Sequence, residues 1–425
     1  MLKLSPATSG ASRAAAVLAA IAAAVVMAGC AAASPAASAS PPGSPAARQS
    51  SSPAGPPSAG PAPDGTASAA GSPAGRVSPA GFRVLSMSFV SDQQGWALGT
   101  VPCGTGRCLS LLGTADGGTA WHQLAAPTRE PGSVYSTCPS GSPCVQQVRF
   151  ATPLIGYAYD PSLFLTTDGG RTWSAQPGAD TSSLETADGT VDRVESGAVG
   201  CAGQPYKFLT APAGGLQWLA APAPEIATIC PPVLYRQGQR LILAGYGNPA
   251  GGVRATAQLG RSADGGQSWV TGLDNCGGSD GYASGVALAP PDVLVLLCEH
   301  QAPEASGAFG PAWVRVSVNG GASFGPDETI PPLVTPQPGE LYGYQLVAAS
   351  AGRLLVTETD LSGRLPGRVL LTGTGGQSWT ATLSLPAGLP VLLVGYEDPD
   401  TGRIAQGGTV WTTRDGGASW VADSF

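Results

Sequence analysis

The prediction of the fold rests on the octet TTDGGRTW, at Thr166–Trp173, and on its copies along the chain. An aspartate beside two glycines is typical of a loop that holds a phosphate or a metal, and also of a tight turn. The other copies in the chain are TADGGTAW at 114–121, SADGGQSW at 262–269, TRDGGASW at 413–420, the weaker SVNGGASF at 317–324 and TGTGGQSW at 372–379, and the remnant APAGGLQW at 211–218. The terminal aromatic residues of successive copies are 41 to 55 residues apart. We therefore interpret the chain as an array of seven repeats.

Each repeat contains short apolar runs separated by turn residues. In the second, a run that ends near Phe150 is followed by IGYAY, LFLTT, the octet and a strand that opens at Trp173. Such short strands predict antiparallel β-structure, and no helical period is found after residue 82. Four-stranded units repeated radially predict an all-β, seven-bladed β-propeller of four-stranded antiparallel blades over residues 82–425.

In this fold the octet becomes the hairpin between the third and fourth strands of a blade. Its aspartate can accept hydrogen bonds from backbone amides, its glycines can take positive φ, and its tryptophan can pack the next strand. A catalytic acid would not recur at four symmetric positions, and Asn319, Thr374 and Ala213 replace the acid in the other copies. We assign a structural role to Asp116, Trp121, Asp168, Trp173, Asp264, Trp269, Asp415 and Trp420.

The N-terminal region is typical of an exported protein. Lys3 and Arg13 precede an apolar run of 16 residues, which is short for a membrane-spanning helix. The run ends in VMAGC, which resembles a bacterial lipobox and implies a signal peptide over 1–29 and lipidation of Cys30. Residues 30–81, rich in Ala, Ser, Pro and Gly, are then a disordered tether. An ordinary cleaved signal peptide or an uncleaved anchor is the alternative.

The remaining eight cysteines suit an oxidising compartment. Their order along the chain favours four sequential disulfides, although eight cysteines allow 105 pairings. The expected pairs are Cys103–Cys108, Cys138–Cys144, Cys201–Cys230 and Cys276–Cys298. With no C-x-x-C motif and two histidines, no metal and no cofactor is expected. The net charge of −7, with scattered basic residues, argues against nucleic acid as a partner.

The octets resemble the BNR or Asp-box repeat of sialidases, of some seven-bladed glycosidases and of sortilin-type propellers. The pairing of GWALG at 95–99 with TTDGGRTW looks most like the propeller of photosystem II assembly factors and their bacterial relatives, within the sialidase-like and WD40/YVTN-like propellers. The resemblance covers residues 82–425 and implies the propeller architecture. The assembly factors among these resembling proteins bind partner proteins. A propeller fold does not by itself define a function.

The competing class is an enzyme, a glycoside hydrolase of sialidase-like type. Resemblance to sialidases would require an arginine triad, a Tyr–Glu pair and a further acid. Only Phe82 and Arg83, in FRVL, match the start of the sialidase F-R-I-P motif, and sialidases have six blades. Other catalytic motifs are also missing from the sequence, so no catalytic residue is assigned and a non-enzyme is expected.

A ligand is expected on the face opposite the octets, where the loops are long and varied. The candidate residues on that face are Tyr135, Asp274, Asp280, Tyr282, Glu340, Tyr342 and Tyr344. The sequence thus predicts an extracytoplasmic lipoprotein, anchored to the cell membrane through Cys30. Its propeller would bind a protein or glycan of the cell envelope in a scaffold or assembly role.

Overall fold

The computed structural model describes residues 79–425 apart from residues 129–143, 179, 197–205, 227–231, 246–257, 274–275, 277–280, 301–311, 333–341, 361–362, 389–390 and 392. The predicted signal peptide, Cys30 and nearly all of the predicted tether lie outside the described residues. In the part that is described, no helix has the length and apolar character needed to span a membrane.

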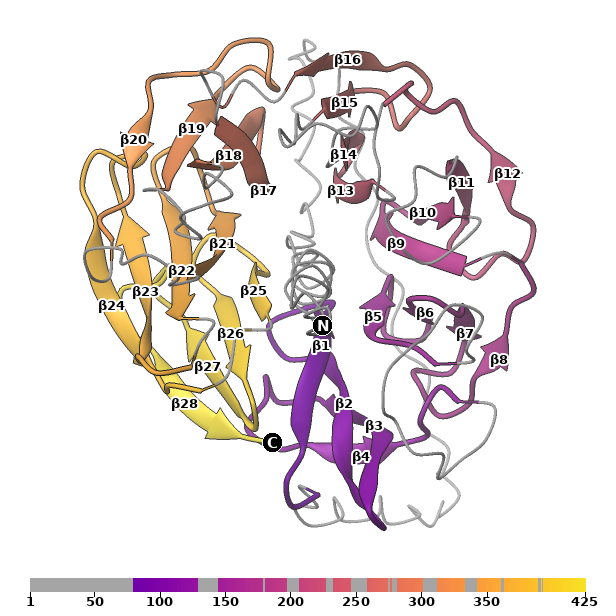
Figure 1. Ribbon diagram of the computed structural model, residues 1–425. Coiled ribbons are helices and arrows are strands. Elements are labelled where there is room, and N and C mark those ends of the chain that lie inside the picture. Colours follow the sequence, from indigo (N-terminus) through magenta and orange to yellow (C-terminus); the bar gives the residue numbers. More distant parts are fainter. Residues whose placement is uncertain are drawn as a thin grey trace, which may run out of the picture. The chain divides into compact units, whose positions relative to one another are not determined.

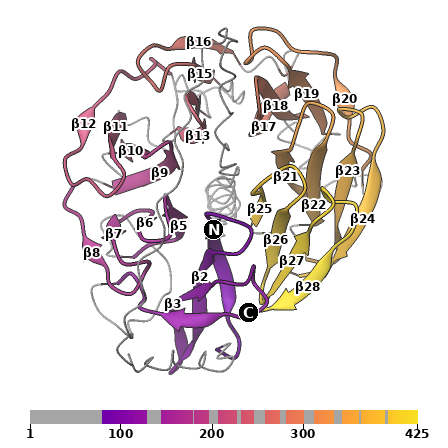
Figure 2. The same ribbon diagram turned by 180° about the vertical axis from the view of Figure 1, so that it is seen from behind.

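The predicted propeller is confirmed. Seven four-stranded antiparallel sheets follow one another along the chain and form a ring (Figures 1 and 2). The first blade is β1 (Arg83–Phe89), β2 (Gly95–Cys103), β3 (Gly106–Thr114) and β4 (His122–Leu124), and the second is β5 (Gln147–Phe150), β6 (Gly156–Tyr159), β7 (Phe164–Thr166) and β8 (Ser174–Ala175). The third is β9 (Asp180–Ala187), β10 (Thr190–Ser196), β11 (Tyr206–Pro212) and β12 (Leu219–Ala220), and the fourth is β13 (Val233–Gln237), β14 (Arg240–Gly245), β15 (Gln258–Ser262) and β16 (Val270–Leu273).

The other three blades have the same order. The fifth is β17 (Gly281–Ala289), β18 (Val293–His300), β19 (Trp313–Ser317) and β20 (Glu328–Thr329). The sixth is β21 (Tyr342–Ala348), β22 (Leu354–Asp360), β23 (Gly367–Thr372) and β24 (Thr380–Leu385), and the seventh is β25 (Leu393–Tyr396), β26 (Gly402–Gln406), β27 (Thr409–Thr413) and β28 (Val421–Ser424). In Figure 1 the first strand of each blade lies innermost.

Packing between neighbouring blades explains why inner strands are apolar on both faces. Along β18, Leu294 and Leu296 pack towards the fourth blade, whereas Val295 and Leu297 pack towards the sixth. Successive side chains of a strand point to opposite faces, so burial of both faces requires a continuous apolar run. Each blade contributes to the cores on its two sides, and a single blade could not bury both faces alone.

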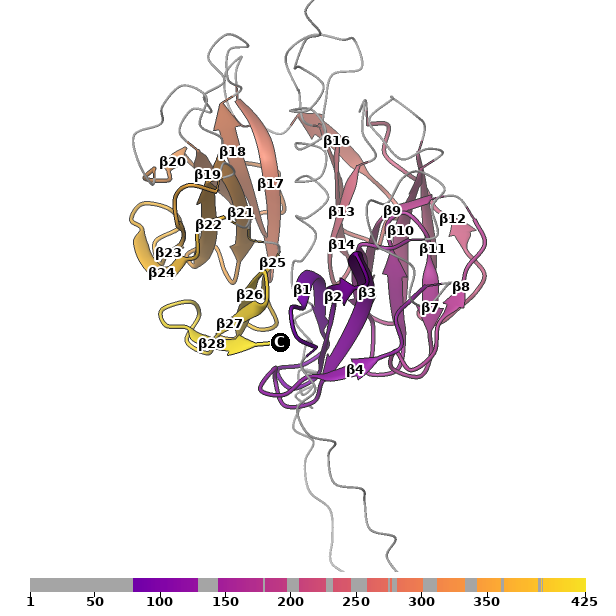
Figure 3. The same cartoon turned by 60° about the horizontal axis from the view of Figure 1, so that its bottom comes forward.

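The ring closes without a strand shared between the first and last blades, since each of these sheets contains four consecutive strands. The tilted view in Figure 3 shows β28 and the C-terminus beside the first blade. Phe425 packs against Phe82 and Trp121, with ring centroids 5.0 and 5.1 Å apart. Side chains and a few backbone hydrogen bonds, such as Val84 N–H to Gly407 C=O at 2.9 Å, therefore hold the ring closed.

Candidate functional site

The octets form the turns between the third and fourth strands of their blades. In the second blade, one oxygen of Asp168 accepts hydrogen bonds from the Thr172 amide at 2.9 Å and the Thr166 hydroxyl at 2.8 Å. The other oxygen accepts from the Thr172 hydroxyl at 2.6 Å. These bonds, first of all that from the Thr172 hydroxyl, lower the pKa of Asp168 to about 2. Both oxygens of the carboxylate thus accept hydrogen bonds within the turn, as a structural role requires.

The octet glycines hold each turn against a first-to-second-strand turn of the same blade. Gly169 has a φ of +77° and donates its amide to Leu154 C=O at 2.9 Å, and Gly320 donates to Asp292 C=O at 2.8 Å. Both kinds of turn therefore lie on one face of the ring, which we call the octet face. A residue with a Cβ would be strained at such positive φ.

The octet tryptophans contact the preceding blade as well as their own. The indole N–H of Trp173 donates to Ala125 C=O at 3.1 Å, and that of Trp269 donates to Pro222 C=O at 2.9 Å. Both acceptors follow the last strand of the blade before. The tryptophan thus links two blades, whereas the sequence predicted only that it would hold the next strand of its own blade.

A pocket of about 480 Å³ lies on the octet face between the fourth and fifth blades. We call it the 4–5 pocket. Among its aliphatic lining residues, Val270 is 61% exposed, whereas Ile242, Leu288 and Leu294 are at most 5% exposed. The polar residues that line it are Arg240, Arg261, Ser262, Ser268, Asp292 and Asn319. This volume is within the range of about 300–1,000 Å³ found for small-ligand sites, which combine apolar walls with few polar groups.

Two arginines dominate the electrostatics of the 4–5 pocket. The Nη2 group of Arg240 forms an ion pair with Asp292 across the blade interface, and Nη1 of Arg261 donates to Gly321 C=O. The buried Nη1 group of Arg240 has no hydrogen-bond acceptor among the described residues. Burial lowers the pKa of Arg240, because water no longer solvates its charge fully. Nη1 is enclosed by the protein, so a ligand would meet Arg261 and the accessible part of the Arg240 side chain, which is 21% exposed.

The residues predicted on the opposite face are only partly described. Tyr135, Asp274, Asp280 and Glu340 lie outside the described residues, and Tyr342 is described by its backbone alone.

Tyr282 and Tyr344 both lie near the opposite face, and each hydroxyl points to a buried glutamate. The Tyr282 hydroxyl donates to Glu299 at 3.4 Å, and the Tyr344 hydroxyl donates to Glu358 at 3.0 Å. Tyr344 is 8% exposed and packs in the core between the fifth and sixth blades. Burial raises its pKa.

The two glutamates differ in their charged partners. Arg368 pairs with Glu358 at 2.8 Å, whereas Glu299 accepts hydrogen bonds from neutral hydroxyls. Burial raises the pKa of Glu299 to about 7. The Tyr344–Glu358 contact, with Arg368 beside it, matches one part of a sialidase-type site, which needs three arginines.

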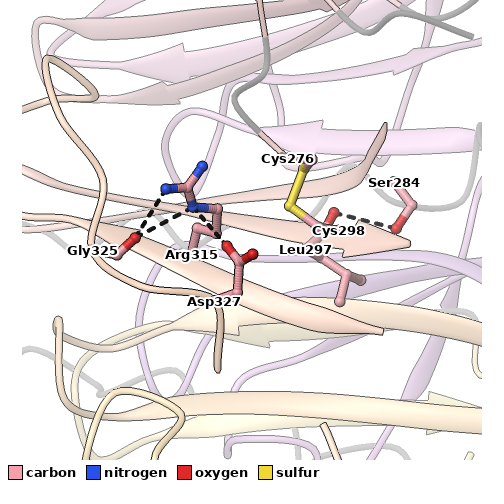
Figure 4. The surroundings of a disulfide bond; sticks show 7 residues. All are labelled: Cys276, Ser284, Leu297, Cys298, Arg315, Gly325 and Asp327. Carbon is pink, nitrogen blue, oxygen red and sulfur yellow. Dashed lines mark hydrogen bonds and ion pairs between the residues drawn. A yellow bond between two sulfur atoms is a disulfide. The ribbon is translucent and has the colours of Figure 1, made fainter. Parts of the chain in front are cut away.

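Two of the predicted disulfides are confirmed, Cys103–Cys108 and Cys276–Cys298. Figure 4 shows the second, which ties the segment before the fifth blade to β18, close to the hydrogen bond from Ser284 Oγ to Leu297 C=O. On the next strand, Arg315 pairs with Asp327 at 3.0 Å. Cys144 is also disulfide-bonded, and Cys138, Cys201 and Cys230 lie outside the described residues.

Sequence reasoning missed the buried charges that join the second, third and fourth blades. Arg149 on β5 pairs with Glu185 on β9 at 2.5 Å, and Asp192 on β10 pairs with Arg236 on β13. All four side chains are at most 4% exposed. No local sequence pattern predicts these pairs, because the partners lie 36 and 44 residues apart.

Among the described residues, no group of three or more His, Cys, Asp or Glu side chains is placed to hold a metal ion. No family model matches the sequence, and no curated protein matches it.

Several solved structures are similar to this chain over most of its length. One is YCF48 bound to a D1 peptide, with 16% identity over 81% of this chain and 83% of the other and a TM-score of 0.32. Another is a xyloglucanase from Xanthomonas campestris, with 12% identity, coverage of 80% and 72%, and a TM-score of 0.33. The propeller domain of the trilobed protease from Pyrococcus furiosus has 6% identity, coverage of 78% and 95%, and a TM-score of 0.46. With TM-scores below 0.5, these similarities transfer no function to this chain.

Proposed function

We propose that this chain is an exported lipoprotein, anchored through Cys30, whose propeller binds a protein or glycan of the cell envelope without catalysing a reaction. The octets are then Asp-box repeats with a purely structural role. The 4–5 pocket is the observation that carries the binding role. It combines the exposed aliphatic side chain of Val270 with the guanidinium groups of Arg240 and Arg261, which is the composition of a binding site.

The proposed tether suits this role. A flexible chain of the length of residues 30–81 spans roughly 40 Å r.m.s., and prolines extend it further. The octet face could therefore meet partners some distance from the membrane surface.

Site-specific photocrosslinking in cells tests the proposal. Val270 lines the 4–5 pocket and is 61% exposed, and Val421 follows the last octet in the same way and is 65% exposed. We expect a photoreactive side chain at position 270 to crosslink a discrete protein or glycan, and the same group at position 421 to give a weaker product or none. Equal labelling from both positions, or from neither, would contradict binding at this pocket.

The alternative function is a glycoside hydrolase of sialidase-like type. The Tyr344–Glu358 contact is the observation that favours it, because a tyrosine activated by a glutamate is the nucleophile of that class. Hydrolysis of a fluorogenic sialoside by the full chain, abolished in Tyr344→Phe, would support the enzyme over the binding module. Activity that survives in Tyr344→Phe would exclude this residue as the nucleophile.

A further inference from the structure

We propose that the 4–5 pocket recognises an extended peptide segment in which an aliphatic side chain and a carboxylate side chain point the same way. This inference rests on the proposed function and names the partner chemistry of its site. The carboxylate would accept from Arg240 and Arg261, and the aliphatic side chain would lie against Val270, which is 61% exposed.

The charges that line the pocket favour an anion. Two guanidinium groups face one carboxylate, that of Asp292, although the whole chain carries a net charge of −7. Asp292 pairs with Nη2 of Arg240, and Gly321 C=O accepts from Nη1 of Arg261, so one carboxylate is left to balance two cations. A ligand carboxylate at the exposed edge of the two guanidinium groups would accept charge-assisted hydrogen bonds, which are stronger than bonds between neutral groups.

The fifth octet supports the same conclusion, because Asn319 takes the place of the aspartate where the octet lines the pocket. Asn319 Oδ1 accepts from the Ser323 amide at 2.9 Å, the distance found between Asp168 and Thr172 in the second octet. Its Nδ2 donates to the Ser323 hydroxyl at 2.8 Å. The turn therefore makes the same hydrogen bonds with either residue. The asparagine, unlike an aspartate, places no negative charge beside the two arginines.

The neighbouring octet keeps its acid, Asp264, which does not line the pocket. Its two oxygens accept from the Ser268 amide and hydroxyl and from the Ser262 hydroxyl, at 2.5 to 2.9 Å. Ser262 and Ser268 thus line the pocket, whereas both oxygens of the Asp264 carboxylate accept hydrogen bonds within their own turn.

The lining favours a peptide over a glycan. Among the described residues that line the pocket, none has an aromatic ring on which a sugar could stack, and the two guanidinium groups match a carboxylate better than hydroxyls. An extended peptide places side chains i and i+2 on the same side, so one can contact Val270 while the other reaches the arginines.

Peptide binding to the detergent-solubilised full chain tests this inference. The probe is a fluorescent octapeptide with blocked ends, Ser-Leu-Ser-Glu repeated twice, and its control has Gln in place of Glu. We expect the Glu peptide to bind at least tenfold more tightly by fluorescence anisotropy. Asn319→Asp should weaken this binding at least fivefold, and Arg240→Gln should weaken it at least tenfold.

Thr374→Asp is the matched control, because it adds the same charge to the sixth octet, outside the pocket. Thr374 accepts from the Ser378 amide at 3.0 Å, so an aspartate fits that turn as well. This variant should bind the Glu peptide as the parent does, and thermal melting should show that all variants are folded.

Equal binding of the Glu and Gln peptides, no binding of either, or equal losses in Asn319→Asp and Thr374→Asp would overturn the inference. Tight binding of an oligogalacturonate, with no binding of the peptides, would replace the peptide with an acidic glycan. If photocrosslinking at position 270 persists in Asn319→Asp while the peptides fail, the proposed function stands and the carboxylate recognition alone is wrong.

Discussion

At Asp168, one carboxylate binds the amide and the hydroxyl of Thr172 and so closes its turn. We predict that Asp168→Ala lowers the free energy of unfolding by about 1–2 kcal/mol, because these hydrogen bonds are lost. Asp168→Asn should lower it by less than about 1 kcal/mol, since Asn319 makes the equivalent bonds in the fifth octet. Urea unfolding at neutral pH measures both values, and a larger loss in Asp168→Asn than in Asp168→Ala would contradict the structural role.

Glu299 is a buried acid with no ion pair to any described side chain, and its pKa of about 7 makes stability depend on pH. Between its ordinary pKa near 4.5 and about 7, the folded chain holds a proton that the unfolded chain has released. The free energy of unfolding therefore falls as the pH rises through this window. We predict that Glu299→Gln removes this fall and is more stable than the parent at pH 8 by about 2–3 kcal/mol, with little difference at pH 4.5.

Urea unfolding of the parent and of Glu299→Gln at the two pH values tests this prediction. Glu358→Gln is the matched control, because it should destabilise the chain at pH 8 by leaving Arg368 without its buried partner. A Glu299→Gln variant that is less stable than the parent at pH 8 would show that the ionised carboxylate is needed.

At the scale of elements, the two described disulfides involve some of the longest strands, β2 and β3 in the first blade and β18 in the fifth. Cys276–Cys298 fastens the segment before the fifth blade to β18. We predict that the mature chain also contains Cys138–Cys144 and Cys201–Cys230, so that its eight propeller cysteines are all oxidised. Peptide mapping without reduction checks this, and a bridge from Cys201 or Cys230 to any other cysteine would show that the sequential pairing fails in the third repeat.

At the scale of the whole molecule, Arg403 helps to close the ring. It pairs with Glu397 within the last blade and donates to Asp92 C=O and Gly117 C=O of the first, at 2.9 and 3.2 Å. Its guanidinium group also lies 3.6 Å from the centre of the Phe89 ring. Because no strand is shared between these blades, such contacts replace the backbone ladder that strand exchange would provide.

We predict that Arg403→Gln lowers the free energy of unfolding by about 3–5 kcal/mol, because Glu397 is left buried without its partner. The control is Arg353→Gln, which breaks the exposed ion pair with Asp400 and should cost less than about 1 kcal/mol. Equal losses in the two variants, measured by urea unfolding, would show that Arg403 has no special part in closing the ring.

Attachment of the whole chain to the membrane depends on Cys30 in our proposal. We predict that Cys30→Ser shifts the protein from the membrane fraction to the soluble fraction, because a thioether-linked lipid can no longer form. Cell fractionation followed by immunoblotting measures this. A variant that stays in the membrane with residues 1–29 attached would indicate an uncleaved anchor.

The number of blades, their strand order and the position of the octet turns could be predicted from the amino-acid sequence, because these features repeat locally. TTDGGRTW specifies a turn through residues at most four positions apart, and seven copies specify the ring. Only the tertiary structure showed the 4–5 pocket, where Arg240, Arg261 and Asn319 come from separate strands and turns of two blades. The same holds for Arg149–Glu185 and for the contacts of Arg403 with the first blade, 286 residues away at Gly117. Such contacts depend on how the blades pack side by side, and a local sequence pattern does not predict which distant side chains will be in contact.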